Sequence, residues 1–116
     1  MPRRSDAVMT GRWDVLAGLD PLLQHRSRMA AAVLLSRHGR LSFSRLRQLL
    51  DETDGNLGAQ LRKLEEAGYF DARKEFVDRK PVTWYELTVR GRRALTDHLD
   101  SLERLIAAGR GVGARR

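Results

Sequence analysis

The first informative feature of the sequence is what it lacks. It contains no cysteine, which excludes a disulfide framework, a thiol nucleophile and a cysteine-ligated zinc site. No apolar run approaches the roughly 20 residues that a membrane-spanning helix needs, and no apolar segment follows Arg3 and Arg4 as it would in a secretory signal. We therefore expect a soluble, cytoplasmic protein.

Residues with catalytic or metal-binding patterns are also scarce. His25, His38 and His98 lie far apart in the sequence, without the spacing of metal ligands. There is no glycine-rich phosphate loop and no nucleophile motif. The sequence thus predicts a protein that is not an enzyme and binds no metal or cofactor, with the three histidines at ordinary surface or packed positions.

The chain does contain apolar material for one small domain and a surplus of basic residues. Of 116 residues, 41% are hydrophobic, and the formal net charge is +7. Residues 1–40 and 89–116 each hold seven basic and three acidic side chains, whereas the middle is nearly neutral. A basic protein of this size favours polyanionic partners, nucleic acid first and acidic membrane surfaces second. Charge alone does not separate the two.

Capping residues divide the first third of the chain into short helices. Thr10 is a candidate cap for a helix over residues 12–17, and Asp20 followed by proline opens another. Ser27 begins a strongly helical run that Gly39 ends.

Two amphipathic helices joined by a tight turn follow. After a short strand at residues 40–43, Ser42 or Ser44 caps the first helix, whose apolar face carries Phe43, Leu46, Leu49 and Leu50. The second helix runs from Thr53 to Gly68, with Leu57, Leu61 and Leu64 on one face. The pair forms a helix-turn-helix pattern.

The last part of the chain reads as a β-hairpin and a long helix. Residues 69–76 and 82–87 are rich in aromatic and β-branched side chains and flank a charged, proline-containing turn. Thr88 then caps a helix with a short heptad seam, formed by Leu95, Leu99, Leu102 and Ile106. The sequence predicts a mainly α fold with a small β-hairpin wing (α+β), that is, a winged helix-turn-helix with an added C-terminal dimerisation helix.

This order of elements suggests four segments. Residues 1–18 form an N-terminal arm, part of which is helical. Residues 19–88 form the winged helix-turn-helix, residues 89–108 the dimerisation helix, and residues 109–116 a glycine- and arginine-bearing flexible tail.

The pieces "TDGNL", "LRKLEEAGY" and "WYELTVRGR" together resemble small winged helix-turn-helix transcriptional regulators related to the MarR and ArsR groups. The resemblance covers about residues 19–106. It departs from the common pattern at Gly58, where serine is usual, and at Gln60, where histidine is usual. The resemblance implies duplex DNA as partner, a homodimer, and, in some relatives, a small-molecule effector.

The helix from Thr53 to Gly68 is the predicted recognition helix. If its leucines face the core, the spacing places four DNA-compatible side chains on another side, namely Thr53, Asn56, Gln60 and Lys63. Gly55 lies in the first turn, where a missing side chain lets backbone N–H groups approach a phosphate. Asp54 is expected to cap or orient rather than bind. The alternative is an ordinary solvated helix face.

Basic residues flank this helix on both sides in the sequence. Around the tip of the wing we expect Arg73, Lys74, Arg79 and Lys80 to contact the sugar-phosphate backbone or the minor groove. Arg45 and Arg47, on the preceding helix, could hold adjacent phosphates. In each case the alternative is solvated surface charge.

The apolar seam and the aromatic residues also allow two interpretations. Leu95, Leu99, Leu102 and Ile106 either form a dimer interface, which we favour, or pack on their own domain. Trp13, Trp84 and Tyr85 either line an effector pocket or, as we favour, serve core and interface packing.

Together these features predict a sequence-specific DNA-binding transcriptional regulator, a repressor by analogy, that acts as a homodimer and not on membranes. Two other functions stay open. One is a winged-helix module for protein–protein interaction, and the other is a nonspecific architectural DNA binder.

Overall fold

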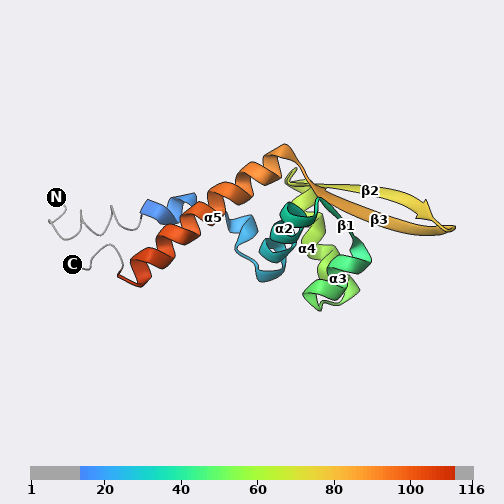
Figure 1. The fold of residues 1–116 in the computed structure, drawn as a ribbon, viewed down its shortest axis with the longest axis horizontal. Coiled ribbons are helices and arrows are strands. Elements are labelled where there is room, and N and C mark those ends of the chain that lie inside the picture. Colours follow the sequence, from blue (N-terminus) through green and yellow to red (C-terminus); the bar gives the residue numbers. More distant parts are fainter. Residues whose placement is uncertain (1–13, 112–116) are drawn as a thin grey trace.

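The computed structural model describes residues 14–111, in which helices surround one end of a three-stranded sheet (Figure 1). Two 3-10 helices, η1 (Asp14–Gly18) and η2 (Pro21–Leu23), precede the helix α2 (Arg26–His38). The order continues with β1 (Arg40–Ser42), α3 (Phe43–Leu50), α4 (Asp54–Glu66), β2 (Phe70–Val77), β3 (Lys80–Leu87) and α5 (Val89–Gly109). The predicted winged helix-turn-helix class with a long C-terminal helix is confirmed.

Most helices begin at the side-chain caps that the sequence predicts. Asp20 accepts a hydrogen bond from the N–H of Leu22 at 2.9 Å, Ser42 caps α3, and Thr53 caps α4. Thr88 caps α5 by accepting from the N–H of Gly91 at 2.9 Å. The suggested cap Thr10 lies outside the described residues.

The predicted start of α2 at Ser27 is wrong. His25 is the cap residue, since its Nδ1 accepts from the N–H of Ser27 at 3.1 Å. Ser27 lies inside the first turn, 2% exposed, and donates its hydroxyl to Glu52 in the turn before α4. A serine next to a strong helix former resembles a cap in sequence, but here a tertiary hydrogen bond uses its side chain.

The sheet has the strand order β1-β3-β2, with both pairings antiparallel. The hairpin is longer than predicted, because Val77 pairs with Lys80 and only Asp78 and Arg79 lie in the turn. Both turn residues have positive φ, 50° and 67°, as a type I′ turn requires. Pro81 belongs to β3 rather than to the turn, at a position beyond the reach of β1.

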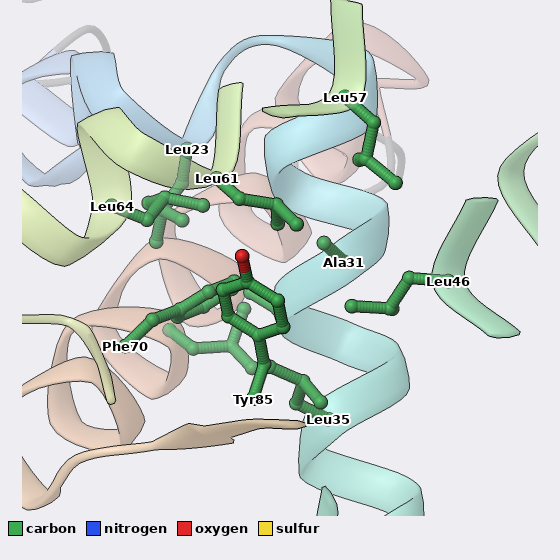
Figure 2. Close-up of a cluster of buried hydrophobic side chains, with 11 residues drawn as sticks. Leu23, Ala31, Leu35, Leu46, Leu57, Leu61, Leu64, Phe70 and Tyr85 are labelled. Carbon is green, nitrogen blue, oxygen red and sulfur yellow. The ribbon is translucent and has the colours of Figure 1, made fainter. Parts of the chain in front are cut away.

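The core lies where α2, α3 and α4 meet the base of the sheet. Figure 2 shows Leu57, Leu61 and Leu64 of α4 directed toward the same space as Phe70 and Tyr85. The two rings pack edge to face with centroids 6.5 Å apart. Burial of the three α4 leucines determines which sides of this helix stay exposed.

Polar contacts attach the N-terminal segment to α5. The N–H of Asp20 donates to Nδ1 of His98 at 2.9 Å, and the hydroxyl of Tyr69 donates to the Asp20 carboxylate. His98 is fully buried, and burial lowers its pKa below the usual 6.5. The side chain is therefore neutral at neutral pH and accepts at Nδ1.

The junction between β2 and α5 leaves no room for a side chain at residue 91. A Cβ added to Gly91 would lie 2.1 Å from the carbonyl oxygen of Tyr69, which already accepts the N–H of Thr88 at 2.9 Å. The neighbouring atoms are backbone and cannot rotate away.

Gly91→Ala should therefore lower the free energy of unfolding by about 3 kcal/mol. Gly109→Ala on the same helix is the matched control, because nothing lies within 4 Å of a Cβ there. Urea unfolding followed by circular dichroism measures both. Equal stability of the Gly91 variant and the wild type would contradict this close approach.

Candidate nucleic-acid interface

Helix α4, the predicted recognition helix, exposes several of the predicted contact residues. Thr53, Asn56 and Lys63 are exposed, and the capping bond from the Asn56 N–H to Thr53 Oγ1 is 3.2 Å long. The cap occupies one acceptor position of the Thr53 hydroxyl and leaves its O–H available. Asn56 also donates from its side-chain nitrogen to Glu52.

Gln60 lies at the edge of this surface rather than on its open part. It is half-buried, and its side-chain oxygen accepts a hydrogen bond from Arg28 of α2. Sequence reasoning did not anticipate this contact, because a bond between residues 28 and 60 depends on how α2 and α4 pack.

The two glycines of α4 are not required by the fold. Nothing lies within 4 Å of a Cβ added to Gly55 or Gly58, and neither has the positive φ that favours glycine. Each glycine disfavours the helix by roughly 0.5–1 kcal/mol relative to alanine. The first turn of α4 is thus left open at a cost in stability that no contact within the described chain explains.

Charges beside the helix are partly neutralised. Arg47 and Asp54 form an ion pair at 3.0 Å. Arg45 donates to Gln48 at 3.3 Å and is exposed. Arg45 is therefore the freer of the two predicted phosphate ligands on α3.

The structure separates the four predicted basic residues of the wing. Arg79 and Lys80 are exposed at the tip, but Arg73 and Lys74 lie within β2, opposite Trp84 and Thr83. The expectation that all four surround the tip was wrong. Since consecutive strand residues point to opposite faces, Arg73 and Lys74 also face different sides of the hairpin.

Two exposed residues of this region were missed by sequence reasoning. Arg62 lies on α4, beyond the predicted stripe, and Phe76 near the wing tip is 78% exposed. Helical spacing from the buried leucines would have found Arg62. Phe76 belongs to the predicted strand, but the hairpin extends past the helices that could cover it (Figure 1).

Within the described residues, Trp84 and Tyr85 do not form the aromatic pocket that was the less favoured alternative. Trp84 and Tyr85 lie on opposite faces of β3, with Tyr85 in the core and Trp84 under the guanidinium of Arg40 at 4.2 Å. The packing interpretation fits both residues. Trp13 lies outside the described residues.

The seam on α5 is divided between the core and the surface. Leu95 is 3% exposed and packs inside its own chain, so it cannot form part of a surface for a partner. Leu99 is 36% and Ile106 51% exposed. Leu99 and Leu102 also border an apolar groove of about 650 Å³ with residues of α2 and α3.

Residues 14–111 contain neither a metal cluster nor a membrane-spanning helix. No group of three or more histidine, aspartate or glutamate side chains there could hold a metal ion. Within the same range, no helix has the length and apolar character to cross a bilayer.

Comparison with known proteins assigns the fold to a family. Residues 27–106 match the family model of the winged helix DNA-binding domain. The chain belongs to this family. The predicted winged helix-turn-helix is thereby confirmed.

Several relatives of the winged helix protein can be compared in detail. A transcriptional regulator homologue from Pyrococcus horikoshii is 31% identical, with a TM-score of 0.71 over 75% of this chain and 86% of that one. MarR itself is 21% identical and shares the fold, with a TM-score of 0.68 over 90% and 75% of the two chains. An uncharacterised protein of Methanocaldococcus jannaschii is 35% identical over 57 residues, 49% of this chain and 62% of that protein. The match thus spans less than two thirds of the length of that curated relative.

The open first turn of α4 leads to a prediction that separates folding from binding. Gly55→Ala should raise the free energy of unfolding by roughly 0.5–1 kcal/mol but weaken duplex DNA binding by about tenfold, or 1.4 kcal/mol, because a methyl group would hold the backbone away from phosphate. Gly58→Ala, one turn further in, should stabilise the fold and leave affinity unchanged. Thermal unfolding and fluorescence anisotropy measure the two quantities. Undiminished affinity of the Gly55 variant would rule out a close approach at this residue.

Proposed function

We propose that this winged helix protein is a sequence-specific transcriptional repressor that binds duplex DNA as a homodimer in the cytoplasm. The observation that carries the proposal is the combination of an open, polar first half of α4 with exposed cations on the adjacent hairpin. The family match supports DNA as the ligand. The direction of control rests on analogy with regulators of this fold.

In the proposed complex, the exposed side of α4 enters the major groove. Asn56, Gln60 and Lys63 offer amide and ammonium groups of the kinds that read base edges. Backbone N–H groups around Gly55 approach a phosphate, and Arg79 and Lys80 follow the sugar-phosphate backbone with the wing. Arg45 and Arg62 add charge on either side.

The proposed dimer uses the end of the molecule that is remote from the wing. α5 leads away from the hairpin, so its last turns and the wing tip lie at opposite ends (Figure 1). Leu99 and Ile106, which are exposed, and Leu102, which is half-buried, follow a coiled-coil spacing along α5. A two-fold symmetric dimer would bind half-sites about 10 bp, or a multiple of that, apart.

Selection of bound duplexes from a random pool at near-physiological salt tests base reading. The wild type should yield a two-fold symmetric motif. Asn56→Ala should blur one position in each half-site, since a good base contact discriminates by about 1–3 kcal/mol. Arg79→Ala should instead weaken all duplexes alike and reduce the salt slope of log K by about 1.

Other outcomes of the selection would point elsewhere. Retained duplexes without a motif, in wild type and Asn56 variant alike, would replace the proposal with nonspecific architectural binding. Failure to retain any duplex would favour a winged-helix module that contacts another protein.

The dimer leads to a separate prediction. Ile106→Asp should convert a dimer into a monomer, because a buried, unpaired carboxylate at the interface is strongly unfavourable. Val89→Asp is the matched control on the same helix, since Val89 is 79% exposed but lies outside the seam. Sedimentation velocity measures the mass of each. A monomeric wild type, or a dimeric Ile106 variant, would contradict this interface.

A further inference from the structure

The side-chain amides of Asn56 and Gln60 on α4 are each hydrogen-bonded to a charged group that can only donate or only accept. Arg28 carries N–H donors and no acceptor. Its Nε donates to the carbonyl of Leu22 at 2.6 Å, and its Nη1 donates to the oxygen of Gln60. The Gln60 oxygen must therefore face Arg28, and the amide nitrogen must face away from it.

Asn56 is held in the opposite sense. Glu52 accepts a hydrogen bond from the Asn56 nitrogen on one carboxylate oxygen and from the Ser27 hydroxyl on the other. Both bonds lower the pKa of Glu52, so it is a carboxylate at neutral pH. Because a carboxylate only accepts, the Asn56 nitrogen faces Glu52 and its oxygen faces away.

We propose that Arg28 and Glu52 are positioning residues that set the reading direction of the two amides, so that Gln60 reads its base by donating and Asn56 reads its base by accepting. The inference rests on the proposed function, since it assumes that α4 enters the major groove. It goes further by naming which bases each residue prefers.

The donors and acceptors on each base edge determine which base each outward-facing amide group can bond. Guanine presents two acceptors, N7 and O6, which match the outward amide hydrogens of Gln60. Adenine presents a donor beside its acceptor, and the Gln60 oxygen that would accept from it faces Arg28 instead. The outward oxygen of Asn56 matches the amino group of cytosine or adenine. An amide that is free to turn over can instead bond adenine at two atoms.

The first turn of α2 holds both amides in place, through Arg28 for Gln60 and through Ser27 and Glu52 for Asn56. Ser27 and Arg28 are consecutive residues in the first turn of α2, with Ser27 2% exposed and Arg28 half-buried. Arg28 joins three elements at once, because its guanidinium bridges η2, α2 and α4. Hydrogen bonds to charged groups are roughly twice as strong as neutral ones, so turning either amide over would lose a strong contact.

Arg28→Met tests the inference, because methionine keeps the length of the side chain and removes its donors. Gln60→Ala first identifies the base pair that Gln60 reads, as the position that blurs in duplex selection. At that position the wild type should select guanine, and Arg28→Met should shift the preference toward adenine by about tenfold, since the freed amide can then bond adenine at two atoms. Arg37→Met, which removes an exposed arginine from the last turn of α2, should leave the preference unchanged.

The outcomes separate the inference from the function on which it rests. A symmetric wild-type motif whose Gln60 position is not guanine, or does not change in Arg28→Met, would overturn the amide orientation and leave the regulator intact. Absence of any wild-type motif would overturn both. If Arg28→Met fails to fold by circular dichroism, Gln60→Glu replaces it. A glutamate still accepts from Arg28 but presents only oxygen, so guanine should be lost in favour of cytosine, and retained guanine would overturn the inference.

Discussion

Burial of three leucines on one side of α4 is the constraint on which the rest of the structure depends. Leu57, Leu61 and Leu64 are fully buried between α2, α3 and the base of the sheet. Because a helix is rigid about its own axis, fixing this side also fixes the direction of every other side chain on it. The open glycine turn and the polar amides face outward as a consequence of core packing.

Polar contacts determine the orientation of the side-chain amides on α4, whose position the apolar core fixes. The first turn of α2 contacts the recognition helix through two hydrogen-bond chains, one through Arg28 and one through Ser27 and Glu52. Packing of the helix fixes the direction in which each side chain leaves it, whereas hydrogen bonds decide which end of a side-chain amide faces outward. The same turn is hydrogen-bonded through Leu22 to the segment that contacts α5, so the proposed DNA surface and the proposed dimer surface depend on the same group of contacts.

The hairpin shows how an element can extend beyond the core. Its base is anchored by Phe70 and Tyr85, and further out its strands carry charged residues and one exposed phenylalanine. Two consecutive residues with positive φ make the reversal tight. Backbone pairing along the full length of both strands then keeps the tip cations at a defined place without a core beneath them.

Much of this architecture can be predicted from the sequence, because it depends on contacts between residues close in the chain. The caps Asp20, Thr53 and Thr88, the leucine spacing of α4 and the two strand patterns are local signals, and the elements form where these signals lie. The tertiary structure alone decided the role of Ser27, the burial of Leu95, the position of Arg73 and Lys74 within β2 and the hydrogen-bond partners of Gln60 and Asn56. Those features depend on contacts between residues tens of positions apart, or on which parts of an element the core covers. Composition and periodicity reveal neither.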